Sequence, residues 1–124
     1  GSRYRLRYRR YRRYRRCSMK EISDGNYISA INSQDLCVVD FYANWCMPCM
    51  RMENAVSQID ETNANLNVYK FNVDKGVGVW SKIKEEFSVR SIPFLVFYRN
   101  GKPIHSAVGY KNAEQIQEIL DNLS

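Results

Sequence analysis

The chain contains 124 residues, of which 44% are hydrophobic and 26% are charged, which is enough apolar material for one packed domain and argues against general disorder. Its net charge of +6 is divided unevenly, because residues 1–18 hold nine arginines and no acidic residue, whereas residues 19–124 hold ten lysines and arginines and thirteen acidic residues. The basic charge therefore belongs to the tail and does not mark the rest of the chain as a nucleic-acid binder, and no apolar run approaches the ~18 residues of a membrane-spanning helix.

Residues 1–18 form a segment apart from the rest. The first two residues resemble a cloning scar, and the following arginines alternate with tyrosines, with Leu6 as the only aliphatic side chain. We expect this segment to be disordered by itself, as an artificial extension or a leader, and the domain to span residues 19–124. Interleaved arginine and tyrosine can also bind nucleic acid or an anionic membrane, and Cys17 could form an intermolecular disulfide.

The next segment predicts a strand, a helix and a second strand. Lys20–Ser23 is expected to be a short strand, and Asp24 to cap a helix that runs to about Asn32. Leu36–Tyr42 is a nearly continuous run of β-forming apolar residues, which is typical of a central strand covered on both faces. One charged residue, Asp40, lies inside this run.

Helices and strands continue to alternate after that strand. Apolar residues recur at helical spacing after Cys49, and Pro48 is tolerated in a first helical turn. The remaining expected elements are a strand at Leu66–Val73, a helix at Val79–Phe87, a strand at Ile92–Tyr98, a turn at Asn100-Gly101, a return strand at Pro103–Val108 and a last helix from Lys111 or Asn112. This order predicts an α/β fold with parallel units followed by a hairpin, and helices available for both faces of the sheet.

The sequence Trp45-Cys46-Met47-Pro48-Cys49 carries the clearest chemical signal. Two residues between the thiols allow both cysteines to lie on the first turn of a helix, close enough to join. The unpaired amides of that turn point at the first sulfur and should lower its thiol pKa. We therefore expect Cys46 to be the attacking thiol and the deeper Cys49 to be the resolving thiol.

Other uses of the cysteines are less well supported. A structural zinc site also contains this spacing but needs a second pair of ligands, and Cys17, Cys37 and the single His105 do not supply one. Four cysteines in a chain that can bury its own core do not indicate a disulfide-dense secreted scaffold. Cys37 is most simply a buried core thiol.

The stretch from Val39 to Cys49 closely resembles the active-site segment of thioredoxins. Further matches in the same order are Lys70, Asp74, Ile92-Pro93, Asn100-Gly101 and Gly109. The resemblance covers residues 19–124 and implies the thioredoxin fold, a central mixed β-sheet flanked by helices on both faces. It also implies a protein-disulfide reductase that works by dithiol–disulfide exchange through Cys46 and Cys49.

The resemblance further implies roles for neighbouring residues. Asp40 would lie under the dithiol and accept the proton of Cys49, with Lys70 as its electrostatic partner, and burial would raise the carboxyl pKa toward neutral pH. Alternatively, Asp40 is a strand-end residue bonded to backbone amides. The substrate would contact the cis proline and its surroundings by strand addition, which implicates Trp45, Met47, Pro48, Ile92, Pro93 and Gly109. Pro93 could equally be an ordinary strand-start proline.

Three residues depart from the usual thioredoxin pattern. Met47 replaces glycine between the cysteines, Met50 replaces a lysine, and Asn54 replaces a proline that kinks the helix. Met47, Met50 and Met52 make the surface near the dithiol unusually apolar and pliable. We expect partner contact for Met47 and core packing for Met52.

The expected partners are a thioredoxin reductase and disulfide-containing protein substrates, with no cofactor beyond the dithiol and no metal. Two alternatives remain open: a thiol oxidase or isomerase of an oxidising compartment, and a binding module anchored by the tail to nucleic acid or membrane. We expect a cytoplasmic monomer, or an organellar or exported protein if the tail is part of a leader.

Overall fold

The computed structural model describes residues 19–123. The strands and helices of this part are β1 (Lys20–Ile22), α2 (Tyr27–Ile31), β2 (Cys37–Tyr42), α3 (Met47–Thr62), β3 (Asn67–Asn72), α4 (Val77–Phe87), β4 (Phe94–Arg99), β5 (Lys102–Val108) and α5 (Ala113–Leu123). They follow the predicted order, with small shifts at their ends. The predictions for residues 1–18, including that for Cys17, lie outside the described residues, as does Ser124.

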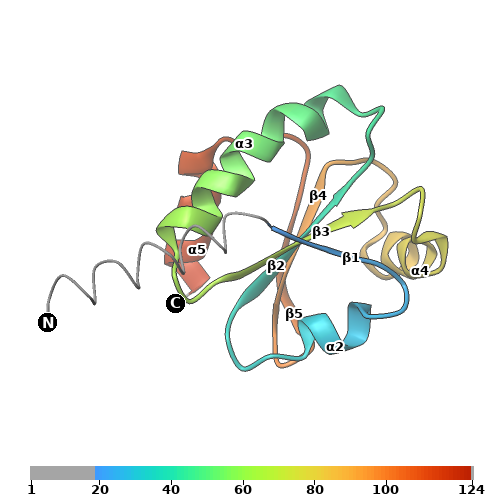
Figure 1. The fold of residues 1–124 in the computed structure, drawn as a ribbon, viewed down its shortest axis with the longest axis horizontal. Helices are drawn as coiled ribbons and strands as arrows, with labels where there is room; N and C mark the ends of the chain where they lie inside the picture. The colour runs from blue at the N-terminus through green and yellow to red at the C-terminus, as the bar shows by residue number, and fades with distance from the viewer. Residues whose placement is uncertain (1–18, 124) are drawn as a thin grey trace, which may run out of the picture.

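The described strands form one mixed sheet in the order β1-β3-β2-β4-β5 (Figure 1). β1 and β2 both pair with β3 in parallel, whereas β4 is antiparallel to β2 and β5 is antiparallel to β4. The predicted mixed sheet and C-terminal hairpin are confirmed, and the turn residues Asn100 and Gly101 have φ angles of 55° and 77°, as tight hairpin turns require. β1 and β2 occupy both edges of β3. β4 therefore pairs with the free edge of β2.

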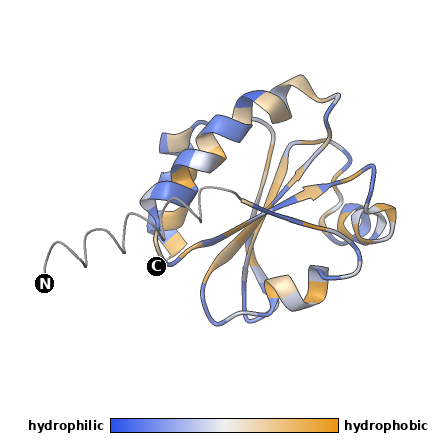
Figure 2. Ribbon diagram, in the orientation of Figure 1, coloured by the Kyte–Doolittle hydropathy of each residue, from blue (hydrophilic) through white to orange (hydrophobic). Residues whose placement is uncertain are grey.

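Helices cover both faces of the sheet, α2 and α4 on one side and α3 and α5 on the other (Figure 1). Hydrophobic residues are concentrated in the central strands, while α3 carries hydrophobic and hydrophilic residues (Figure 2). All six residues of β2 are buried, as predicted for a central strand. Phe41 belongs to the core beneath α2 and α4, and Val38 to the core beneath α3 and α5. Because successive strand residues face opposite sides, Asp40 faces α3.

The prediction for Asp24 was wrong in one respect, because Asp24 caps a different helix. The residue before α2 is Asn26, whose side chain makes no capping bond to that helix. Asp24 instead accepts hydrogen bonds from the backbone amides of Gly78 at 3.2 Å and Val79 at 2.9 Å, in the first turn of α4. The first amides of a helix have no partner within it, and the loop after β1 brings a carboxylate to those of α4.

Candidate active site

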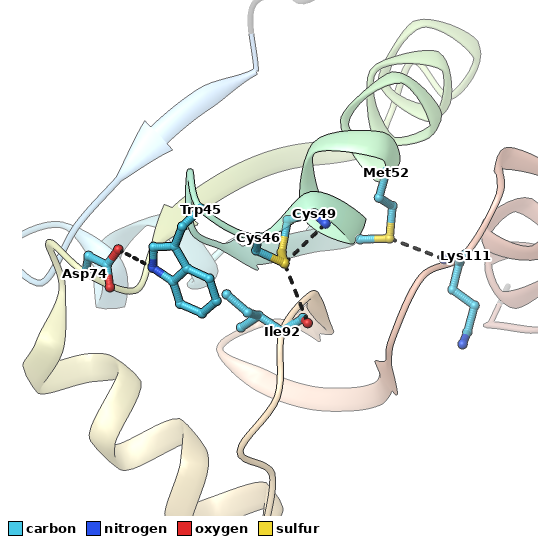
Figure 3. Close-up of a disulfide and its surroundings, with 7 residues drawn as sticks. All are labelled: Trp45, Cys46, Cys49, Met52, Asp74, Ile92 and Lys111. Atoms are coloured by element: carbon cyan, nitrogen blue, oxygen red, sulfur yellow. Dashed lines mark hydrogen bonds between the residues drawn. A yellow bond between two sulfur atoms is a disulfide. The ribbon is translucent and has the colours of Figure 1, made fainter.

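Cys46 and Cys49 form a disulfide at the junction of β2 and α3, with their Cα atoms 5.2 Å apart. Cys46 is the N-cap residue of α3, and its Sγ accepts a hydrogen bond from the backbone amide of Cys49 at 3.3 Å (Figure 3). Pro48 lies in the first turn of the helix, where its missing N–H has no partner to lose. The geometry matches the prediction that the first-turn amides point at the first sulfur.

The disulfide lies just beneath the surface. Cys46 is 5% exposed and Cys49 is 1% exposed, so Cys49 is the deeper residue, as predicted. The flanking Trp45 and Met47 are 69% and 63% exposed. A partner that approaches Cys46 would therefore meet an apolar surface made by these two side chains.

The loop before β4 lies against the disulfide from the other side. The Ile92-Pro93 peptide bond is cis, and the carbonyl oxygen of Ile92 is 3.7 Å from Cys46 Sγ (Figure 3). Gly109 follows β5 with a φ angle of 91°, and its amide donates a hydrogen bond to the carbonyl oxygen of Pro93 at 2.8 Å. The structure thus brings Ile92, Pro93 and Gly109 together near Cys46, although both Ile92 and Pro93 precede the strand that was predicted to contain them.

Trp45 is held in place by its polar edge. The indole Nε1–H donates a hydrogen bond to Asp74 Oδ2 at 2.9 Å, and the ring lies beside Cys46 (Figure 3). Asp74 follows β3 and is oriented by Asn72, whose side-chain oxygen accepts a hydrogen bond from the Asp74 amide at 2.9 Å. The exposed indole is therefore a fixed feature of the surface around the dithiol.

Asp40 is a buried carboxyl on β2, the strand that leads to the disulfide. It is 1% exposed, and its Oδ1 has no hydrogen-bond partner among the described residues. Burial raises the pKa of Asp40 to about 7, an effect that Lys70 opposes and that Glu53 and Glu21 reinforce. A carboxyl with such a pKa can exchange a proton near neutral pH.

Lys70 lies opposite Asp40 in the pairing of β2 with β3. Its ammonium makes a direct ion pair with Glu53 on α3 at 3.0 Å and lies 4.3 Å from the centre of the Tyr42 ring. The Tyr42 hydroxyl in turn donates to Glu21 Oε1 at 2.6 Å. Sequence reasoning identified the pairing of Lys70 with Asp40 and missed Glu53, although Glu53 stands one helical turn after Cys49 and therefore on the same face of α3.

Two methionines of α3 and the remaining cysteine of the described residues pack into the core. Met52 is fully buried, and its sulfur accepts a hydrogen bond from the Lys111 amide at 3.4 Å (Figure 3), which confirms the expected packing role. Met50 is partly buried against the core. Cys37 is buried, and burial raises the pKa of its thiol to about 11, so the prediction of a core thiol is confirmed.

No group of three or more His, Cys, Asp or Glu side chains within residues 19–123 is arranged to hold a metal ion. Likewise, none of the helices between residues 19 and 123 is both long and apolar enough to cross a membrane.

The chain is similar in sequence and structure to proteins named thioredoxin. The family model described as Thioredoxin matches residues 18–122. A thioredoxin from Alicyclobacillus acidocaldarius is 33% identical over 80% of this chain and 91% of its own length, and thioredoxin-2 from Saccharomyces cerevisiae is 35% identical over 82% and 94%. The crystal structure of Malassezia sympodialis thioredoxin superposes with a TM-score of 0.71 and 29% identity, over 85% of this chain and 90% of the other. These relatives do not favour the oxidase, isomerase or tail-anchored alternatives.

Proposed function

Since the chain belongs to the thioredoxin family of thiol–disulfide oxidoreductases, we propose that it reduces protein disulfides with Cys46 as the attacking thiol and Cys49 as the resolving thiol. The observation that carries this assignment is the hydrogen bond from the Cys49 amide to Cys46 Sγ at 3.3 Å. In the reduced protein the same amide and the start of α3 would stabilise a thiolate at Cys46. Cys49 has no equivalent position, because it lies within the helix.

The reaction exchanges one dithiol for another: the protein dithiol becomes a disulfide while the substrate disulfide becomes two thiols. The Cys46 thiolate attacks one sulfur of the substrate disulfide, which forms a mixed disulfide and releases the other substrate sulfur as a thiolate that takes up a proton. Cys49 then loses its proton and attacks Cys46 Sγ. This step releases the second substrate sulfur as a thiol and forms the Cys46–Cys49 disulfide seen in the structure. Two electrons pass from the protein to the substrate, and the dithiol itself serves as the redox group.

Asp40 is the proton acceptor for Cys49 in this proposal. This role is supported by the burial of the Asp40 carboxyl, by its unpartnered Oδ1 and by its pKa of about 7. A base with a pKa near the working pH combines a large ionised fraction with useful basicity. Lys70 acts on Asp40 electrostatically, because it lowers the carboxyl pKa against the effect of burial.

The substrate binds on the surface around Cys46. An extended peptide would pair with the backbone at Ile92 by strand addition, next to Pro93 and Gly109. Trp45, Met47 and Pro48, which flank Cys46 in the chain, are exposed and would contact the side chains of the peptide. The exposed apolar area of Trp45 and Met47 favours substrates with apolar residues beside the disulfide.

We further propose that a thioredoxin reductase restores the dithiol, that no other cofactor takes part, and that the protein acts as a monomer in the cytoplasm. Residues 1–18 are taken to lie outside the catalytic domain. The test is reduction of insulin disulfides by the chain, with and without a thioredoxin reductase and its nicotinamide cofactor. Turnover that depends on the reductase and is lost in Cys46→Ser supports the proposal. Failure to reduce insulin with a chemical reductant present would contradict it.

A further inference from the structure

Glu53 and Lys70 form an ion pair that links α3 to β3. The Lys70 ammonium is 3.0 Å from Glu53 Oε1, and the two side chains are 13% and 46% exposed, respectively. An ammonium that is this deeply buried requires a partner. In this fold it has the Glu53 carboxylate and the face of the Tyr42 ring, 4.3 Å from the ring centre.

Asp40 competes for the same ammonium. It stands opposite Lys70 in the strand pairing, and its Oδ1 accepts no hydrogen bond from any described residue. The charged and titratable groups that act on Asp40 are Lys70 from β3, Glu53 from α3, Glu21 from β1 and the neighbouring Tyr42 on β2 itself. One ammonium therefore lies among three carboxyl groups, and Glu53 has the direct contact.

We propose that Glu53 is a positioning residue for the exchange reaction, because it holds the Lys70 ammonium toward α3 and so prevents it from closing a direct ion pair with Asp40. This inference rests on the proposed role of Asp40 as the proton acceptor for Cys49. Glu53 has its ion pair with Lys70 and acts through Lys70 and the charge on Asp40.

The consequence is a more basic Asp40. A direct ion pair with lysine lowers a carboxyl pKa by about 1–3 units, and a nearby carboxylate raises it. With Glu53 in place, Asp40 keeps a pKa near the working pH and can take up a proton. Without Glu53, Lys70 is free to pair with Asp40, which then becomes a weaker base for Cys49.

The direct test is the titration of Asp40 by carboxyl carbon NMR in the oxidised protein, which does not depend on activity. Glu53→Gln keeps the size of the side chain and removes its charge. We expect the Asp40 pKa to fall by about one unit or more. Glu61→Gln, which removes the same charge from an exposed position near the C-terminal end of α3, is the control and should leave the Asp40 pKa unchanged.

A second background separates the effect through Lys70 from the direct effect of the Glu53 charge. When Lys70 is already replaced by methionine, Glu53→Gln should lower the Asp40 pKa by less than half as much as it does in the wild-type protein. An equal fall in both backgrounds, or no fall in the wild type, would overturn the inference.

The pH dependence of the resolving step tests the link to catalysis. We expect its inflection in Glu53→Gln to move to lower pH by the same amount as the Asp40 pKa. An unmoved inflection would overturn the positioning role. The proposed function is tested separately by Asp40→Asn, since an unaltered rate–pH curve in that variant would remove Asp40 from the mechanism, whatever Glu53 does.

Discussion

Replacement of Asp40 by alanine should stabilise the protein at alkaline pH and slow the exchange reaction. Asp40 is 1% exposed and has an orphaned Oδ1, and alanine would suit the surrounding apolar strand better. The variant therefore separates a residue kept for proton transfer from one kept for packing.

The size of the effect follows from the pKa of the carboxyl. Burial raises the Asp40 pKa from 3.8 to about 7, and one pKa unit corresponds to about 1.4 kcal/mol. Because the folded pKa is the higher one, the folded protein holds the proton longer than the unfolded chain does. Stability is therefore lost as the pH rises from about 4 to about 7, by about 4 kcal/mol in total. Alanine removes this loss but leaves a small cavity that costs about 1–2 kcal/mol.

Urea unfolding of the oxidised protein at pH 4 and pH 8 measures both contributions. At pH 8 we expect Asp40→Ala to be more stable than the wild type by about 2–3 kcal/mol, with a Tm about 10 °C higher. At pH 4 the carboxyl is protonated in the folded protein and about half protonated in the unfolded chain, so little of this loss is present and the variant should be less stable by about 1 kcal/mol. The exposed Asp35→Ala is the control and should change little at either pH.

The same variant should reduce disulfides more slowly near neutral pH and recover part of its rate at alkaline pH, where Cys49 ionises without help. Strong destabilisation at pH 8 together with an unaltered rate–pH curve would refute this reasoning. Asp40 would then be a structural residue.

Two further predictions concern the cysteines and the cap of α4. In the reduced domain, brief iodoacetamide treatment at neutral pH should label Cys46 before Cys49 and Cys37. The start of α3 stabilises the Cys46 thiolate, whereas burial raises the pKa of Cys37 to about 11. Mass mapping that finds Cys49 labelled first would reverse the assigned roles. Asp24→Ala should lower the free energy of unfolding by about 1 kcal/mol, because the Gly78 and Val79 amides lose their partner. An unchanged urea midpoint would show that this cap contributes nothing.

Local patterns in the sequence were sufficient to predict the dithiol geometry. The two-residue spacing and the following helical periodicity place Cys46 at the N-cap of α3, and these features depend on neighbouring residues only. The burial of Asp40 was likewise predictable, because it interrupts a run that forms a fully buried strand. In both cases the local preference and the tertiary structure agree.

Contacts between distant segments could not be predicted in the same way. Asp24 caps α4 rather than α2 because folding brings residues 54 and 55 positions apart together. Lys70 was expected to serve Asp40, yet its direct ion pair is with Glu53 on a helix that crosses the sheet. The contact of the Ile92 carbonyl with Cys46 was implied only by the thioredoxin resemblance, since it joins two loops 46 positions apart.

The central claim is that Cys46 attacks and Cys49 resolves, and a trapping experiment tests it most directly. Reduced Cys49→Ser and Cys46→Ser are each mixed with a protein disulfide substrate and separated on a non-reducing gel. Cys49→Ser should accumulate a mixed disulfide through Cys46 that a reductant releases, because attack proceeds and resolution cannot. Cys46→Ser should trap little. Equal trapping by both variants, or by neither, would contradict the assignment.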